Sequence, residues 1–233
     1  MRNYLTEFIG TFFLVLTVGL TVLQHVALAP LAIGAALMTM VYMGGHVSGG
    51  HYNPAVSLAV FLRGKMKSGG ELGAYMLSQF LGAVAAALTV RIILGRTFAP
   101  APGDGVSMTS ALLVEFLFTF ALALVVLNSA ASARTQGNSF YGLAIGFTVV
   151  VGAFAGGAIS GGAFNPAVGL GPAVVHGLVG EASVGHAWLY IVGPALGGAA
   201  AAAVFGLQER PEVHLHAEPS RVPEGRRRGT SNE

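Results

Sequence analysis

Long apolar runs, separated by short polar or glycine-rich segments, make up most of the chain. The first run, residues 4–28, is long enough to cross the hydrocarbon layer of a bilayer, which is roughly 30 Å thick. We interpret six runs as membrane spans, at about residues 4–28, 31–43, 71–94, 109–131, 140–154 and 186–206. From residue 208 onward the chain is polar and contains several prolines, which predicts a disordered tail over residues 208–233. The pattern therefore predicts an all-α membrane protein.

A thirteen-residue stretch occurs twice, once in each half of the chain. Residues 44–56 read GGHVSGGHYNPAV and residues 156–168 read GGAISGGAFNPAV, and the copies match at nine positions without a gap. Asparagine favours the cap before a helix, and proline favours the first helical position. Each Asn-Pro pair is therefore predicted to begin a helix too short to span, and these helices are expected at about residues 53–62 and 165–175. The repeat divides the chain into two units of three spans, about residues 1–95 and 108–207.

Basic residues near the span ends predict how the chain is oriented. With the N-terminus inside, the cytoplasmic side receives Arg2, Arg63, Lys65, Lys67, Arg134 and the tail arginines, and the outer side receives Arg91 and Arg96. The positive-inside rule thus predicts a multi-pass protein of the cell membrane with cytoplasmic N- and C-termini. Because each unit has an odd number of spans, the second unit enters the membrane upside down, which makes an inverted repeat. The two short helices then become re-entrant half-helices that meet near the midplane.

Composition agrees with this architecture and narrows the possible functions. Hydrophobic residues make up 54% of the chain and charged residues only 9%, which is typical of a polytopic membrane protein. The net charge of +2 does not predict a nucleic-acid partner, because much of the positive charge lies in the tail. The absence of cysteine excludes disulfides and thiol catalysis. His46 and His51 are replaced by alanines in the second copy, so we expect them to pack by hydrogen bonding and expect no metal site or cofactor.

The repeated stretches are predicted to line a pore. Non-helical backbone at membrane depth is tolerated only where it packs in protein or lines a wet cavity. We expect the glycines to let both GGxxSGG segments run extended, with carbonyl groups turned toward a passage. The half-helices would direct the positive ends of their dipoles at each other, with the amides of Asn53 and Asn165 between them. Water there would accept hydrogen bonds, while protons and cations would be disfavoured.

The paired Asn-Pro-Ala motifs resemble those of the aquaporin, or major intrinsic protein, family. The matching residues are Asn53, Pro54, Ala55, Asn165, Pro166 and Ala167. The resemblance covers about residues 2–207, and the stretch WLYIVGP from Trp188 is similar to nodulin-26-like and related bacterial channels. The family pattern implies that Glu7 and Glu115, at equivalent points of the first and fourth spans, brace the motif loops by accepting backbone N–H bonds. Alternatively, the two carboxylates lie at the membrane interface and favour a helix start.

The selectivity filter is where the chain departs from the water-channel pattern. Members of the family commonly form it from an aromatic residue, a histidine, a small residue and an arginine. The matching positions here are Ile33, Ala153, Gly162 and Val168. These residues imply a wider opening without the five N–H donors of an arginine. Alternatively, another basic residue reaches the place of the missing arginine.

The resemblance implies a passive channel rather than an enzyme. The expected permeants are water and small uncharged solutes such as glycerol, urea or metalloid hydroxides like arsenous acid. A mainly water-selective channel remains an alternative. An ion-coupled transporter is disfavoured because no charged group is evident at the midplane, and a scaffold role because the loops are short. The family also implies a homotetramer with one pore per subunit, and we expect Gly73, Gly82 and Gly197 to allow close helix packing.

Overall fold

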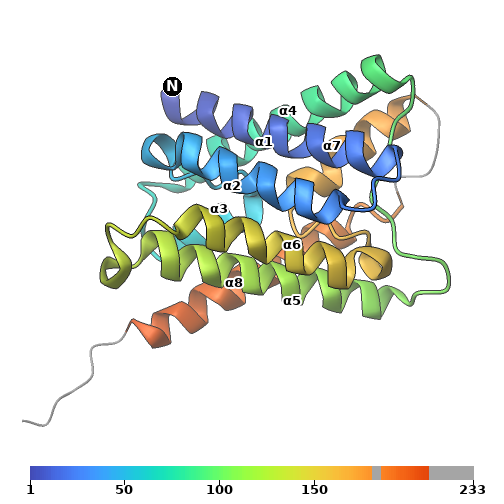
Figure 1. Ribbon diagram of the computed structural model, residues 1–233. Coiled ribbons are helices and arrows are strands. Elements are labelled where there is room, and N and C mark those ends of the chain that lie inside the picture. Colours follow the sequence, from blue (N-terminus) through green and yellow to red (C-terminus); the bar gives the residue numbers. More distant parts are fainter. Residues whose placement is uncertain (180–184, 210–233) are drawn as a thin grey trace, which may run out of the picture.

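The fold is a bundle of long helices around two short ones (Figure 1). The computed structural model describes residues 1–179 and 185–209. The elements are α1 (Arg2–Leu23), α2 (Ala29–Ser48), α3 (Pro54–Leu62), α4 (Gly69–Leu94), α5 (Met108–Val126), the π-helical turn η1 (Leu127–Ala131), the 3-10 turn η2 (Ala133–Thr135), α6 (Tyr141–Ser160), α7 (Pro166–Leu178) and α8 (Leu189–Gln208). Among the described residues, six helices are long and apolar enough to cross a membrane, which confirms the predicted spans.

The repeated stretches are more helical than the sequence suggested. Helices α2 and α6 continue through the first two glycines of each copy and end at Ser48 and Ser160. The expectation that the whole GGxxSGG segments run extended is therefore wrong, and only residues 49–53 and 161–165 are non-helical. The helices end there because Gly49 and Gly161 adopt left-handed conformations, with φ angles of 92° and 93°. Glycine accepts this geometry without a Cβ clash and closes a helix C-terminus.

The two halves pack in the same manner. Helix α1 packs along α4 as α5 packs along α8, and α2 crosses α6 between the halves. A Cβ atom at Gly82 would lie 2.4 Å from the carbonyl oxygen of Phe8, and one at Gly197 would lie 2.5 Å from that of Phe116. These two glycines therefore permit close helix contact within the chain. Gly73 has no neighbouring atom within 4 Å of such a Cβ and does not serve this purpose within the chain.

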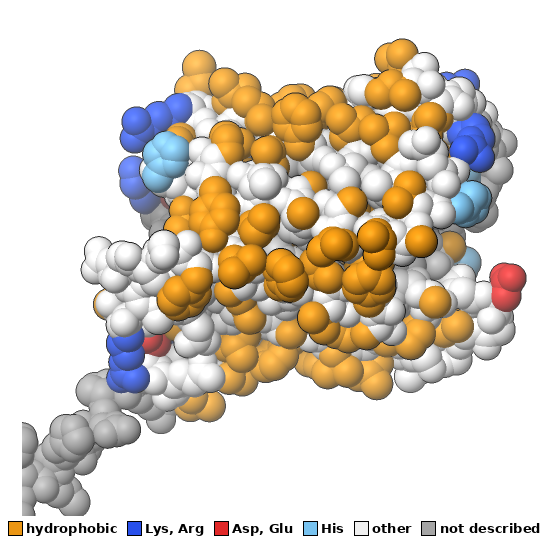
Figure 2. All heavy atoms as spheres, in the orientation of Figure 1, with side chains coloured by type: hydrophobic (Ala, Val, Ile, Leu, Met, Phe, Trp, Pro, Cys, Tyr) orange, Lys and Arg blue, Asp and Glu red, His pale blue; other side chains and the backbone are white. Residues whose placement is uncertain are grey.

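The outer surface of the bundle is largely apolar. Figure 2 shows hydrophobic side chains across the middle of one face, with the coloured charged groups near its two ends. Leu77 on α4, Ile92 on α4 and Val151 on α6 are 58%, 83% and 58% exposed. Large exposed apolar area on long apolar helices is what a bilayer requires, so the structure supports a multi-pass membrane protein. The N-terminus and the end of α8 lie at the same end of the bundle (Figure 1).

The last helix extends slightly beyond its predicted end. Gln208 closes α8, whereas we expected it to begin the polar tail. Its Oε1 accepts a hydrogen bond from Asn128 Nδ2 at 2.9 Å, and Ser132 Oγ donates to Glu209 Oε1 at 2.5 Å. These contacts fasten the end of α8 to the turns that follow α5. The remainder of the predicted disordered tail lies outside the described residues.

Candidate functional site

Glu7 joins α1 to the first motif loop. Its Oε1 accepts hydrogen bonds from Ser48 Oγ at 2.6 Å and from the His51 N–H at 3.0 Å. Its Oε2 accepts from the Tyr52 N–H at 2.7 Å and from Gln79 Nε2 at 2.8 Å. The side chain is fully buried, and a buried carboxylate is stable only when its oxygens are bonded in this way. The four donors therefore fix the loop on α1, and the Glu7 carboxylate is not exposed at the surface of the bundle.

Glu115 makes the corresponding contacts in the second half. Ser160 Oγ and the Ala163 N–H donate to its Oε1 at 2.7 and 3.0 Å, and the Phe164 N–H donates to its Oε2 at 2.6 Å. Glu115 is likewise fully buried. The two halves differ in one donor, because Gln79 donates to Glu7 whereas no side-chain amide of residues 1–179 and 185–209 donates to Glu115. Both loops are thus fastened to a long helix by a carboxylate.

The residue before each motif asparagine has an unusual backbone conformation. Tyr52 and Phe164 both have a φ angle of 48°, in the left-handed region that bulky residues rarely adopt. Such a conformation persists where surrounding contacts hold it. Here a carboxylate binds the N–H of each residue, and an asparagine from the other half binds its carbonyl oxygen. The strained residues therefore lie where the two halves meet.

The motif asparagines bind across the interface between the halves. Asn53 Nδ2 donates to the Phe164 carbonyl at 2.9 Å, and Asn165 Nδ2 donates to the Tyr52 carbonyl at 2.8 Å. Each Oδ1 also accepts the N–H of the alanine two residues later at 2.9 Å, which caps its half-helix. An amide nitrogen carries two hydrogens, so each asparagine keeps one N–H after this bond. Because both side chains line the same cavity, two donors remain for a bound molecule.

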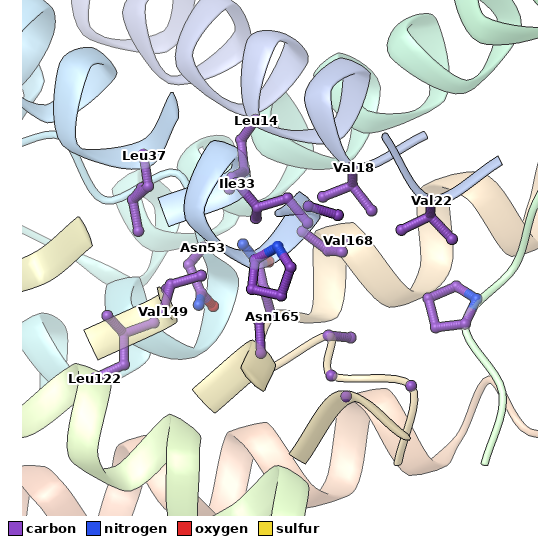
Figure 3. A pocket seen from close by; sticks show the side chains of 18 of the residues that line it. Leu14, Val18, Val22, Ile33, Leu37, Asn53, Leu122, Val149, Asn165 and Val168 are labelled. Carbon is purple, nitrogen blue, oxygen red and sulfur yellow. The ribbon is translucent and has the colours of Figure 1, made fainter. Parts of the chain in front are cut away.

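This cavity of about 410 Å³ brings the four predicted filter positions together. Ile33, Ala153, Gly162 and Val168 line it with Asn53 and Asn165. In Figure 3, Ile33 and Val168 lie close to the two asparagines, and Leu37, Leu122 and Val149 lie on the other side of the asparagines. Other aliphatic residues complete the wall: Leu14, Val18, Val22, Val56, Val126 and Ile145. The cavity is thus a mostly apolar passage with one polar side.

Electrostatics at the cavity come from backbone groups more than from charged side chains. Within the described part of the chain, its lining includes no Arg, Lys, Asp or Glu. No basic residue of this part therefore takes the place of the missing arginine. The N-terminal ends of α3 and α7 carry partial positive charge, roughly half an elementary charge each. Gly161, Gly162 and Ala163 also line the cavity, and their carbonyl oxygens are the acceptors that they offer.

The cavity continues toward the end of the bundle that carries the N-terminus. His51 and Val126 line both this cavity and a second hollow of about 330 Å³. Gly49 and Lys65 line that hollow and a third one of about 530 Å³, which Gln136 also reaches. The three hollows therefore form a series from the loop after α4 to the loop before α6. His51 is held by a contact of 3.0 Å between its Nδ1 and Ser57 Oγ, a packing contact of the expected kind.

The sequence did not identify the loop after α4 as part of the site. Ala99, Pro100 and Ala101 line the mouth of the cavity, and the Gly103 N–H donates to the Ile159 carbonyl at 3.1 Å. Thr97 Oγ1 of the same segment lies 2.7 Å from His176 Nδ1 on α7. The proline- and glycine-rich composition of residues 96–107 predicts only a connecting loop. Nothing in that pattern indicated that it folds over the cavity.

Comparison with known proteins agrees with this geometry. Residues 1–205 match the family described as Major intrinsic protein. The glycerol uptake facilitator protein-like 6 of Lactiplantibacillus plantarum is 35% identical over 87% of this chain and 95% of that protein. Nodulin-26 of Glycine max is 33% identical over 89% of this chain and 78% of that protein.

A solved structure shows the same fold. The aquaglyceroporin from Plasmodium falciparum has a TM-score of 0.79 with 23% sequence identity, over 88% of this chain and 94% of that chain. At this identity the likeness establishes the fold alone. The family match over nearly the whole described chain establishes more: this chain belongs to the major intrinsic protein family of membrane channels.

Proposed function

We propose that the chain is a passive channel for water and small uncharged solutes with an aliphatic, arginine-free selectivity filter. The observation that carries this proposal is the lining of the 410 Å³ cavity, in which Ile33, Ala153, Gly162 and Val168 surround the approach to Asn53 and Asn165. The channel would correspond to the repeats of residues 1–207.

The polar side of the cavity supports hydrogen bonding to a neutral solute. The remaining N–H groups of Asn53 and Asn165 donate to water or a hydroxyl, and the carbonyl groups of residues 161–163 accept from it. The opposite wall is aliphatic and suits the C–H groups of a polyol. A solute such as glycerol thus meets matching surfaces on both sides.

The filter positions favour solutes larger than water. Valine has no donor and less bulk than arginine, and Ala153 and Gly162 leave space beside it. Glycerol and urea are the proposed permeants, and metalloid hydroxides such as arsenous acid have the same small, neutral, hydroxyl-rich character. A relative is named a glycerol uptake facilitator protein-like 6, which supports the polyol.

Ions are excluded by the cost of removing their water, not by the size of the filter. Stripping the water from an ion in an apolar constriction costs far more free energy than stripping it from a neutral solute. The positive ends of α3 and α7 add a barrier to cations. The buried carboxylates Glu7 and Glu115 do not line this cavity, and their oxygens are bonded to loop donors, so they do not offer a site for a coupling ion.

The assembly and orientation are part of the same proposal. The chain would form a homotetramer with one pore per subunit in the cell membrane, with both termini in the cytoplasm. Arg2, Arg63, Lys65 and Lys67 belong to the end of the bundle that carries the N-terminus, which supports this orientation by the positive-inside rule. No nucleic acid is a partner in this proposal.

Stopped-flow light scattering on proteoliposomes tests the function. We expect fast shrinkage under a sucrose gradient, fast re-swelling with glycerol or urea, and no proton leak beyond that of empty vesicles. Fast shrinkage without re-swelling would instead indicate a mainly water-selective channel. Saturable uptake that depends on sodium or protons would indicate an ion-coupled transporter and contradict the proposal.

A further inference from the structure

A separate cavity, which is not one of the three hollows of the pore, lies on the other side of the Asn-Pro-Ala motifs. It has a volume of about 380 Å³, within the range of about 300–1,000 Å³ typical of small-ligand pockets. Its lining comes from four helices: Pro54, Ala55 and Leu58 of α3, Pro166, Ala167 and Leu170 of α7, Met76, Leu77 and Phe80 of α4, and Ile191 and Ala195 of α8. We call it the rear groove.

The first turns of α3 and α7 form a wall between the pore and the rear groove. The cap residue Asn53 and Val56 of α3 line the pore, whereas Pro54, Ala55 and Leu58 of α3 line the groove. Helix α7 divides its residues in the same way, with Asn165 and Val168 toward the pore. A molecule in the groove therefore contacts the first turns of α3 and α7, which position both asparagines, on the side away from the pore.

The groove exists because two long helices leave a gap. Helix α4 packs against α7 and α3, and α8 packs against α3 and α7, but α4 and α8 have no extended contact with each other. The half-helices close the bottom of this gap. Leu77 and Ile191, which are 58% and 43% exposed, form its rims, so the groove opens to the outside of the bundle.

The position of the groove along the membrane-spanning helices indicates what surrounds it. The half-helices begin at the level where Asn53 and Asn165 bond across the two halves, between the ends of six spans. Outside the bundle at this depth lies the hydrocarbon of the bilayer. Every lining side chain is apolar, and the prolines that begin both half-helices carry no N–H. The groove therefore offers no side-chain hydrogen-bonding group to a polar ligand.

We propose that the rear groove binds one acyl chain of a membrane phospholipid. An empty groove would deprive its lining of dispersion contacts, and an acyl chain restores them without leaving a polar group unpaired. The floor residues Ala55 and Ala167 are each only 1% exposed, beneath the rims. A flexible chain reaches this floor. A helix of a second copy, about 10 Å wide with its side chains, would rest on the rims.

The bound chain would support the wall from behind. It packs on Leu58 and Leu170 and limits outward movement of the two helix starts. The asparagine pair is then held between its own cross-bonds on the pore side and lipid on the groove side. This role is independent of which solute passes through the pore.

Photo-crosslinking tests the proposal without measuring transport. The full chain is reconstituted with phosphatidylcholine that carries a diazirine at the middle of one acyl chain, and labelled peptides are mapped by mass spectrometry. We expect labelling of residues 76–80 and 191–195 well above that of Leu88, which faces outward on the same helix α4 at 46% exposure and does not line the groove. Equal labelling of these segments would overturn the proposal.

Variants on α8 make the test specific. Ala195→Phe fills the groove and is expected to remove most of the labelling at residues 76–80. The matched control, Leu196→Phe, alters a neighbour that is 54% exposed and does not line the groove, and should keep that labelling. Ile191→Phe, at an exposed rim, serves as a second filling variant if Ala195→Phe does not fold. Undiminished labelling in a folded filling variant would overturn the assignment.

Cysteine variants test whether a second copy of the chain, rather than lipid, covers the rear groove. The chain has no cysteine, so Leu77→Cys or Ile191→Cys introduces the only thiol. If another copy covered the groove, a benzophenone maleimide attached to that thiol would crosslink to the covering copy on illumination in the membrane, whichever of its residues faced the groove, and the lipid assignment would be wrong. We expect monomers on denaturing gels after the same treatment.

Discussion

Asn53 of the first half donates a hydrogen bond of 2.9 Å to the carbonyl oxygen of Phe164 in the second half. The reciprocal bond from Asn165 to Tyr52 is 2.8 Å long. Each loop therefore depends on the other for its conformation, although each is fastened to a long helix of its own half. The pair joins the repeats and leaves two N–H donors for the permeant.

This relationship predicts the effect of Asn53→Asp. The carboxylate would still accept the Ala55 N–H, so the helix cap would remain, but it could not donate to the Phe164 carbonyl. Losing one partner of a buried hydrogen bond costs about 1–3 kcal/mol. We expect a lower melting temperature in detergent micelles and reduced water flux. A melting temperature equal to that of the unaltered chain would show that the cross-bond contributes little.

The hydrogen bonds of Glu7 and Glu115 predict that their glutamine variants differ in thermal stability. Glu7→Gln and Glu115→Gln each place an amide NH₂ against at least one backbone N–H donor. In Glu7→Gln, an amide NH₂ in the place of Glu7 Oε2 would also remove the acceptor of the Gln79 amide, which the second half does not have, so we expect Glu7→Gln to lower the melting temperature more than Glu115→Gln. Thermal unfolding of both variants in one detergent measures this order. The reverse order would contradict the role given to Gln79.

Two tyrosines give a matched test of the helix ends. Tyr75 Oη donates to the Ser48 carbonyl at 2.8 Å, and Tyr190 Oη donates to the Ser160 carbonyl at 2.6 Å. Each replacement by phenylalanine should lower the free energy of unfolding by about 1 kcal/mol, the usual net value of one hydrogen bond. Because the two contacts share no residue, the double variant should show the sum if the two helix ends are independent. A clearly larger combined loss would indicate that the two loops unfold together.

Much of the fold was predictable because its signals are local. Six apolar runs give the spans, and each Asn-Pro pair gives a half-helix start. The ends of α2 and α6 were placed too early because glycine is a poor helix former in water, whereas inside the bundle it allows close approach. A Cβ at Gly44 would lie 2.2 Å from Tyr52 Oη, so the helix needs glycine at that position.

The site was only partly accessible from the sequence. The filter residues were found by their spacing from the motif asparagines, and the structure brings them into one cavity, while their part in selectivity stays a prediction. The loop of residues 99–101 was missed because its position depends on contacts with distant segments, such as Gly103 with Ile159. Tertiary contacts of this kind leave no periodic signal in the chain. The rear groove was missed for the same reason, since it arises from four helices.

The size of the filter predicts the effect of Ala153→Leu. Ala153 and Gly162 both line the cavity, so added side-chain volume at Ala153 should slow glycerol more than water. Val151→Leu is the control, because Val151 is 58% exposed and lies outside the cavity lining. Stopped-flow re-swelling with glycerol measures the effect. Equal slowing in both variants would point to a general folding defect.

Val168→Arg tests the central claim, that an arginine-free filter admits small neutral solutes. Val168 is only 5% exposed and lines the cavity, so an arginine there would add bulk and a positive charge. Val168→Leu separates the two effects, since leucine adds bulk without charge or donors. The decisive measurement is the ratio of glycerol to water permeability in proteoliposomes of all three proteins. We predict that the ratio falls sharply in Val168→Arg and less in Val168→Leu, and an unchanged ratio in Val168→Arg would contradict the account.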